Sequence, residues 1–294
     1  MLKKLCIFIT FPLNLATSFT LLAEEPTQPE AQIVSGSWYE TDSKVMGERR
    51  RYAVYLPPSY RDDQNKRYPV LYVLDGSATK LRGVAGMVEA LSSEELSHQI
   101  PEFILVAIPN TNRSRDLTPT KTDLMFNGKV LDKLAENSGG ADKFAKFIDQ
   151  ELFKTIETTF RTNQQRGLLG MSFGGLFTAH VMLNQPEMFT HYLIADATFV
   201  WDENYLNRTL NNSLVKLTSA SLDVFLGLAN NDHLGELGMT NRRWGSDFVQ
   251  GLKGIDNDQL RVSSRYFADE KHGTVTYLAF YFGLIELFGQ SEHP

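Results

Sequence analysis

Short apolar runs alternate along the chain with longer stretches in which apolar residues recur every three or four positions. Residues 69–74 and 103–108 are continuous apolar runs bounded by polar turns, as is typical of parallel strands buried on both faces. Residues 141–160 place apolar side chains on one face of an amphipathic helix. Further strands are predicted at 32–56, 168–170, 192–195, 222–228 and 262–267, and further helices at 81–96, 176–183, 203–217, 241–252 and 274–288.

This alternation predicts an α/β fold, with a mainly parallel sheet covered by helices on both faces. Residues 32–56 alternate between apolar and polar positions and are expected to form antiparallel strands. No Pro- or Gly-rich linker divides residues 24–294, which are expected to form one domain. Sites in such sheets lie beyond the carboxyl ends of the strands. Four polar residues follow predicted strands and are expected at that edge: Asp75, Ser172, Asp232 and His272.

The sequence Gly170-Met171-Ser172-Phe173-Gly174 stands between a predicted strand and a predicted helix. This is the context in which Gly-x-Ser-x-Gly exposes a nucleophilic serine on a sharp turn. The serine then needs a positive φ, which costs a non-glycine residue about 1–3 kcal/mol. Gly170 and Gly174 are expected to remove Cβ atoms that would collide. The pattern predicts Ser172 as a nucleophile, with an ordinary serine in a glycine-rich turn as the alternative.

A serine hydroxyl needs a base within hydrogen-bond distance and a third group that orients the base. His272 is the predicted base, because it lies in a polar loop between the last strand and the last helix. Asp232 follows the penultimate strand and is the predicted acid, which gives the order Ser, Asp, His found in α/β-hydrolases. Asp196, at the end of an earlier strand, and Glu236 remain alternatives for the acid.

Ester hydrolysis also requires two hydrogen-bond donors for the oxyanion of the tetrahedral intermediate. The backbone N–H of Phe173, directly after the nucleophile, is the first predicted donor. The second is expected from the loop after residues 69–74, at Gly76 or Ser77, because glycine there permits close approach of the backbone. A plain tight turn at Gly76 is the alternative.

Residues 1–23 have the composition of a secretory signal peptide, with Lys3 and Lys4 ahead of an apolar run that leads to Ala23. We expect cleavage after Ala23 and export to the periplasm or the medium, with no stable membrane association afterwards. An uncleaved anchor is the alternative. Cys6 lies inside this segment, so the mature chain would contain neither a thiol nucleophile nor a thiolate metal site.

The net charge of the chain narrows the classes of molecule that it is expected to bind. Without Lys3 and Lys4 the chain keeps 27 basic and 35 acidic side chains, a net charge of −8 with neutral histidines. An acidic chain without a basic cluster argues against nucleic acid and anionic membranes as partners. A small-molecule substrate is therefore expected, and the sequence does not indicate an oligomeric state.

Several motifs together resemble the esterase D family of α/β-hydrolases, and its branch of periplasmic siderophore-esterase-like enzymes in particular. The similarity spans residues 32–288. The motifs are Pro-Pro-Ser-Tyr at 57–60, Pro-Val-Leu-Tyr-Val-Leu-Asp-Gly at 69–76, Arg-Asp-Leu-Thr-Pro-Thr at 115–120, Gly-Met-Ser-Phe-Gly-Gly at 170–175 and His-Gly-Thr-Val at 272–275. The resemblance implies carboxylic-ester hydrolysis with Ser172 as nucleophile, His272 as base, no cofactor and no metal.

Two departures from the family pattern bear on the site. Relatives often carry Ser-Pro-Ser-x-Trp where this chain has Asp-Ala-Thr-Phe-Val-Trp at 196–201, and often Glu where it has Asn231-Asp232. Some siderophore esterases use serine and histidine without an acid. The resemblance therefore leaves the role of Asp232 open.

Arg115, Trp201 and Trp244 are the candidate substrate-binding residues. Arg115 belongs to a charged loop, residues 113–116, that could contact an anionic or catecholate group. The alternative, which we favour slightly, is a solvated loop held by internal ion pairs. The two tryptophans, together with Phe199, could line an acyl pocket or belong to the core.

The residues predict a serine esterase that acts through an acyl-enzyme intermediate, with a siderophore trilactone as one candidate substrate. An acyltransferase on the same scaffold is the alternative within enzymes, distinguished by its products in the presence of an acceptor alcohol. A non-catalytic binding protein with a hydrolase fold is the alternative outside enzymes.

Overall fold

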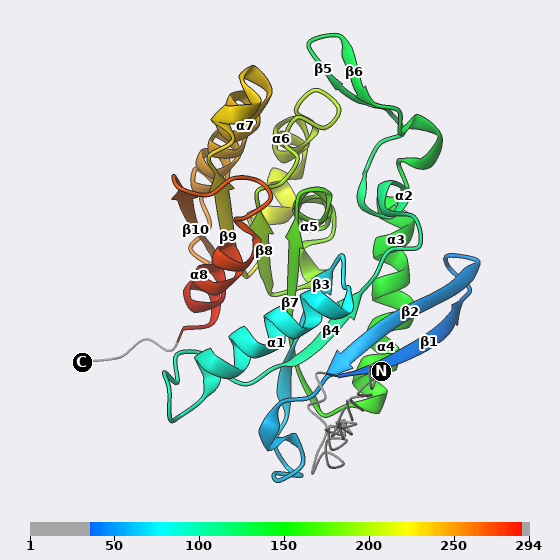
Figure 1. Ribbon diagram of the computed structural model, residues 1–294, viewed down its shortest axis with the longest axis vertical. Coiled ribbons are helices and arrows are strands. Elements are labelled where there is room, and N and C mark those ends of the chain that lie inside the picture. The colour runs from blue at the N-terminus through cyan, green and yellow to red at the C-terminus, as the bar shows by residue number, and fades with distance from the viewer. Residues whose placement is uncertain (1–35, 290–294) are drawn as a thin grey trace, which may run out of the picture. The chain divides into compact units, whose positions relative to one another are not determined.

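The computed structural model describes residues 36–289, which are built around an eight-stranded sheet (Figure 1). The pairs β1–β2 and β2–β4 are antiparallel, and every other neighbouring pair is parallel. The prediction of a mainly parallel sheet is confirmed. In spatial order the strands are β1 (Ser37–Ser43), β2 (Glu48–Tyr55), β4 (Ile104–Ile108), β3 (Tyr68–Leu74), β7 (Thr162–Met171), β8 (His191–Ala195), β9 (Leu222–Ala229) and β10 (Leu260–Phe267).

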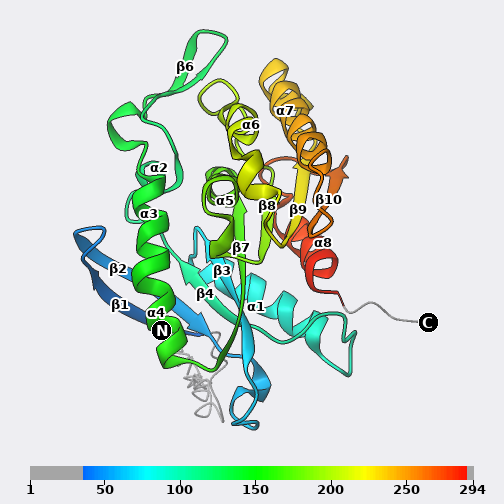
Figure 2. The same cartoon turned by 180° about the vertical axis from the view of Figure 1, so that it is seen from behind.

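Helices cover both faces of this sheet. Figures 1 and 2 show α1 and α8 on one face and α3 to α7 on the other. The α-helices are α1 (Ala78–Ser92), α2 (Arg113–Leu117), α3 (Ala141–Phe147), α4 (Phe153–Thr159), α5 (Phe173–Asn184), α6 (Tyr205–Leu217), α7 (Glu236–Lys253) and α8 (Thr276–Phe288). Single helical turns are η1 (Pro58–Tyr60), η2 (Ala135–Asn137), η3 (Ile148–Leu152), η4 (Pro186–Met188) and η5 (Asp232–Leu234).

The side chains of the central strand β3 pack alternately into two hydrophobic cores, one on each face of the sheet. All seven of its residues are buried. Val70 and Tyr72 pack into the core beneath α3 to α7, whereas Leu71 and Val73 pack into the core beneath α1 and α8. Successive side chains of a strand point to opposite faces, so a continuous apolar run is the sequence pattern that such a strand requires.

The helix predicted at 141–160 follows one helical path that is divided by a π-helical turn, η3, between α3 and α4. Other predicted boundaries shift by a few residues. For example, α7 begins at Glu236, five positions before the predicted start.

The long connection at residues 110–140 contains α2 and a separate hairpin of β5 (Leu124–Phe126) and β6 (Lys129–Asp132). The hairpin forms its own two-stranded sheet and does not pair with the central one. In both views it stands at the same end of the molecule as the start of α7, with α5 and α6 between the two (Figures 1 and 2).

The predicted signal segment, residues 1–23, lies outside the described residues. Among the helices between residues 36 and 289, none combines the length and hydropathy needed to cross a bilayer.

Candidate active site

Ser172 occupies a sharp turn between β7 and α5, with φ 61° and ψ −120°. A positive φ in a non-glycine residue is strained and is characteristic of functional turns. A Cβ on Gly170 would lie 2.2 Å from the carbonyl oxygen of Gly174, so glycine is required at position 170. Apart from its chain neighbours and the backbone of α5, a Cβ on Gly174 would come no closer than 3.4 Å to another residue, which is an ordinary contact. The prediction that a Cβ at Gly174 would collide with its surroundings was wrong.

The side chains of Ser172, His272 and Asp196 form a continuous hydrogen-bonded chain. Nε2 of His272 lies 3.0 Å from Oγ of Ser172, and Nδ1 of His272 lies 2.6 Å from Oδ2 of Asp196. Asp196 is fully buried at the carboxyl end of β8, whereas the His272 side chain is 39% exposed. A buried carboxylate on one imidazole nitrogen and a hydroxyl on the other is the arrangement that activates a serine.

Asn231 fixes both partners of this carboxylate–imidazole pair. Its Nδ2 donates to Oδ2 of Asp196 at 2.9 Å, and its Oδ1 accepts the backbone N–H of His272 at 2.8 Å. The backbone N–H of Ala229 donates to the other oxygen of Asp196 at 3.1 Å. These bonds satisfy the buried carboxylate and hold the loop that carries His272.

The structure contradicts the prediction of Asp232 as the orienting acid. The Asp232 side chain is 53% exposed and forms an ion pair with Arg242 at 2.6 Å. It lies on η5, and Glu236 begins α7, so both face the surface beside the site. Asp196, which the sequence had left as an alternative, is the residue that contacts His272.

The backbone N–H of Phe173 remains the predicted first oxyanion donor. Phe173 is the first residue of α5, and the first N–H groups of a helix have no partner within it. The backbone N–H of Gly76 instead donates to the carbonyl oxygen of Ile108 at 3.0 Å, and that of Ser77 to the carbonyl oxygen of Asp75 at 2.8 Å. The prediction of Gly76 as the second donor was wrong, because this glycine serves the close approach of β3 to β4.

Ser172 and His272 open into a cleft of about 210 Å³. Leu124 and Leu131 of the hairpin form one wall, and Leu234 and Leu237 at the start of α7 form another. The remaining lining residues are Phe173, Thr198, Val200, Asn231, Gly238 and Asn241. His272 is the sole titratable residue in this lining, and most of the surface that the lining exposes is apolar.

Comparison with known proteins assigns the chain to a family. The sequence profile of the family described as "Putative esterase" matches residues 43–213, which is more than half of the chain. The chain belongs to this esterase family. The predicted resemblance to the esterase D family and its siderophore-esterase-like members is therefore confirmed.

Individual relatives support the same assignment. The structure of an IroE-like serine hydrolase from Shewanella oneidensis is 30% identical, covers 86% of this chain and 80% of its own, and has a TM-score of 0.79. The ferri-bacillibactin esterase BesA of Bacillus subtilis (strain 168) is 23% identical over 253 residues, 80% of this chain and 85% of that protein. The siderophore hydrolase EstA from Aspergillus nidulans, 20% identical with a TM-score of 0.71 over 90% and 96% of the two chains, shares the fold.

In this esterase Arg115 belongs to an internal ion-pair network and not to the cleft. Its guanidinium contacts Glu48 at 2.6 Å and Asp116 at 2.8 Å. Asp116 also pairs with Arg50 at 2.7 Å, and both of these side chains are fully buried. Arg115, helped by Arg50 and opposed by partial burial, lowers the pKa of Glu48 to about 2. The predicted substrate-binding role of Arg115 was wrong, and the alternative of internal ion pairs is confirmed.

Arg113, from the same charged loop, contacts the residue that follows the nucleophile. Its guanidinium binds the Asp75 carboxylate at 2.8 Å and sits 5.1 Å from the centre of the Phe173 ring.

The two tryptophans lie in or against the core and do not line the cleft. Trp201 is fully buried, donates its indole N–H to Oγ1 of Thr120 at 2.8 Å, and meets the Phe173 ring edge-on at 5.3 Å. Trp244 is partly buried on α7, where it packs against the core. Neither contributes to the cleft, and Phe199 is also a core residue. The predicted acyl pocket of Trp201 and Trp244 was wrong.

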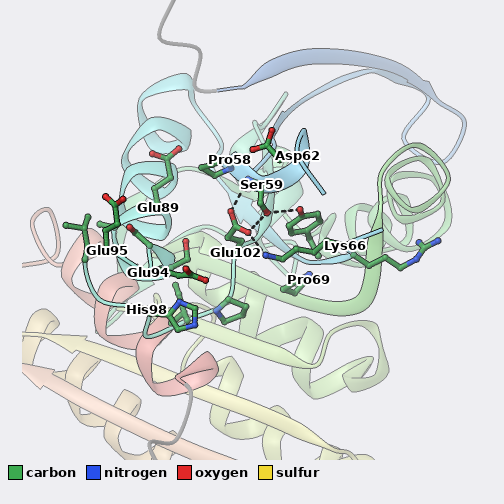
Figure 3. Close-up of a pocket in the computed structure, with 18 of the residues that line it drawn as sticks. Pro58, Ser59, Asp62, Lys66, Pro69, Glu89, Glu94, Glu95, His98 and Glu102 are labelled. Atoms are coloured by element: carbon green, nitrogen blue, oxygen red, sulfur yellow. Dashed lines mark hydrogen bonds and ion pairs between the residues drawn. The ribbon is translucent and has the colours of Figure 1, made fainter. Parts of the chain in front are cut away.

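A larger hollow, of about 1150 Å³, lies away from Ser172 and is drawn in Figure 3. Four of its polar residues bind one another: Glu102 accepts from Ser59 and, at 2.6 Å, from Lys66, while Ser59 and Tyr68 share a hydrogen bond of 2.8 Å. The bond to Glu102 raises the pKa of Lys66, which keeps its ammonium charged and unable to act as a base. Among the described residues no cluster of three His, Cys, Asp or Glu could hold a metal ion.

Sequence reasoning missed the hairpin wall of the cleft. The signal was present, because Asn127-Gly128 stands between the apolar residues 124–126 and 130–131, and Asn-Gly is a strong hairpin turn. Asn231 was also missed as the residue that joins Asp196 to His272. No sequence feature distinguishes it from other loop asparagines.

Proposed function

We propose that this esterase is a serine hydrolase that cleaves carboxylic esters through an acyl-enzyme intermediate on Ser172. The observation that carries the proposal is the continuous chain from Ser172 through His272 to Asp196, with distances of 3.0 and 2.6 Å. Family membership supports ester chemistry, and the strained turn supports a nucleophilic role for this serine.

In the acylation step, Oγ of Ser172 attacks the ester carbonyl carbon while Nε2 of His272 takes the hydroxyl proton. Asp196 accepts the Nδ1–H of His272, which holds the ring in the tautomer that can receive a proton and stabilises the imidazolium that forms. The N–H of Phe173 donates to the developing oxyanion. The C–O bond then breaks, and His272 returns the proton to the leaving alcohol.

In the deacylation step, His272 takes a proton from water, whose oxygen attacks the acyl carbon. The tetrahedral intermediate collapses with release of the carboxylic acid, and the proton passes from His272 to Oγ of Ser172. An acceptor alcohol in place of water would make the protein an acyltransferase. Product analysis with and without added alcohol separates the two outcomes.

A siderophore trilactone is the narrower candidate substrate. Its support comes from relatives described as a ferri-bacillibactin esterase, a siderophore hydrolase and an IroE-like serine hydrolase. The cleft of about 210 Å³ is smaller than the roughly 300–1,000 Å³ of sites that enclose drug-sized ligands. It would hold one part of such a molecule and leave the rest in solvent. Hydrolysis of iron-free and ferric trilactones, measured beside simple esters, tests this candidate.

Labelling with a fluorophosphonate tests the hydrolase proposal itself. We expect stoichiometric labelling of the wild-type protein and none of Ser172→Ala. The absence of labelling, under conditions in which a known serine esterase reacts, would leave the non-catalytic binding protein as the better account.

A further inference from the structure

The hairpin β5–β6 has an irregularity in its pairing at a residue that lines the cleft. Leu124 pairs with Asp132 and Met125 pairs with Val130, so Leu131 is an extra residue without a partner. Such a β-bulge re-aims side chains, and bulges are frequent next to active sites. Leu131 lines the cleft with Ser172, whereas Val130 does not, although each is 47% exposed.

The base of the hairpin is fastened to the rest of the connection. Oδ1 of Asp123 accepts the backbone N–H groups of Leu134 and Ala135, both at 2.8 Å. Ser138 bonds to the N–H and carbonyl of Thr122 at 3.0 and 2.9 Å. An isolated two-stranded hairpin is marginally stable in water, so these anchors give the leucine wall a defined position.

The cleft wall at the start of α7 also leaves apolar surface exposed to water. Leu234 is 48% exposed and lies with Leu237 across the cleft from the hairpin. Covering exposed leucine surface is favourable in proportion to the area removed from water. The lining contains no Asp, Glu, Lys or Arg, so an ion that enters would find none of these charged side chains to offset its lost hydration. The walls therefore favour a neutral, apolar group.

We propose that this cleft binds the acyl group of the substrate and selects an apolar chain of medium length. The inference rests on the proposed hydrolase function, because Ser172 and His272 line the same cleft. A series of esters that differ only in the acyl chain tests whether the acyl group is the part that binds there. The cleft of about 210 Å³ is smaller than the roughly 300–1,000 Å³ of sites that enclose drug-sized ligands, so it suits a chain of medium length better than a long one.

The test measures kcat/KM for p-nitrophenyl acetate, hexanoate and dodecanoate with the wild-type protein and four variants. We expect wild type to prefer hexanoate to acetate by about tenfold or more. Leu131→Ser and Leu234→Ser should each lower the hexanoate-to-acetate ratio by about tenfold, and Leu131→Phe, which narrows the cleft, should move the preference to acetate. Val130→Ser is the matched control, since it changes an equally exposed neighbour outside the cleft, and its ratio should stay within about twofold of wild type.

A binding measurement separates this inference from the hydrolase proposal. Calorimetric titration of Ser172→Ala with ethyl hexanoate should show binding that Leu131→Ser weakens in the double variant. If no ester is hydrolysed but this binding is found, the hydrolase proposal falls with the acyl assignment, and the cleft stands as a binding site for an apolar chain. If acetate and hexanoate are hydrolysed equally well, or Val130→Ser changes the ratio as much as Leu131→Ser, the inference is overturned. A rate that rises only above the micellar concentration of the ester would assign the leucines to a lipid surface and would also overturn it.

Discussion

Oδ2 of Asp196 lies 2.6 Å from Nδ1 of His272, although the two residues are 76 positions apart in the chain. Asp196 is fully buried and accepts two further hydrogen bonds, from the backbone of Ala229 and the side chain of Asn231. The imidazole therefore has a fixed orientation before any substrate binds. This preorganisation is what turns a surface histidine into a base for Ser172.

The contact between Asp196 and His272 predicts that turnover depends on the carboxylate of Asp196 and not on that of Asp232. Asp196→Asn should lower kcat for p-nitrophenyl esters by about 10³–10⁴-fold, because the amide favours the wrong imidazole tautomer, and His272→Ala should cost at least as much. Asp232→Asn, which removes only an exposed ion pair, should change kcat by less than about twofold. Circular dichroism controls for folding. A crippled Asp232→Asn beside a fully active Asp196→Asn would reverse the assignment.

The sequence could predict Ser172 and His272 because their signals are local. Ser172 is marked by the spacing of the glycines around it, and His272 by its polar loop between the last strand and the last helix. Asp196 and Asp232 follow the neighbouring strands β8 and β9, so topology brings both to one edge of the sheet. Which of them faces His272 depends on side-chain direction. Asp196 follows β8 directly with φ 38°, whereas η5 carries Asp232 toward Arg242.

The sequence also could not predict which groups the N–H of Gly76 and the side chain of Arg115 contact. Gly76 fits an oxyanion donor by composition, but its N–H is committed to Ile108 by the register between β3 and β4. Arg115 fits a substrate contact by charge, but the fold places Glu48, 67 positions away, against it. Both errors come from long-range contacts that no local pattern encodes.

The buried pair of Arg50 and Asp116 predicts a large loss of stability on substitution. Asp116→Asn leaves the guanidinium of Arg50 buried without its closest charge partner, which typically costs about 3–5 kcal/mol of unfolding free energy. Glu48 still contacts Arg50, so we expect the lower end of that range. Urea denaturation gives the value. Asp42→Asn, which removes an exposed pair with Arg49, is the control and should cost less than about 1 kcal/mol. Equal losses in the two variants would contradict the network's role.

The lowered pKa of Glu48 predicts an acid-dependent contribution to stability. The folded-state pKa is about 2, compared with 4.5 for the free group, so the unfolded chain binds the proton more readily. The contribution is therefore complete above about pH 4.5 and is lost as the pH falls toward 2. Wild type and Glu48→Gln should differ most in unfolding free energy near neutral pH and converge in this window. A difference that stays constant from pH 6 to pH 2.5 would show that the ionised carboxylate is not responsible.

The N-terminal segment predicts export. When the full sequence is expressed in a bacterial host, the mature protein should appear in the periplasm or the medium with Glu24 as its first residue. Fractionation and N-terminal sequencing check this. Recovery of the chain from Met1 onward in the membrane fraction would favour the uncleaved anchor.

The central claim, that Ser172 carries the acyl group, is tested most directly by trapping the intermediate. The protein is mixed with p-nitrophenyl hexanoate, quenched in acid within the first turnover and digested, and the peptides are weighed by mass spectrometry. We expect a burst of about one p-nitrophenol per active site and a hexanoyl group on the peptide that contains Ser172, both absent in Ser172→Ala. Acylation at another residue, or unchanged turnover in Ser172→Ala, would contradict the account.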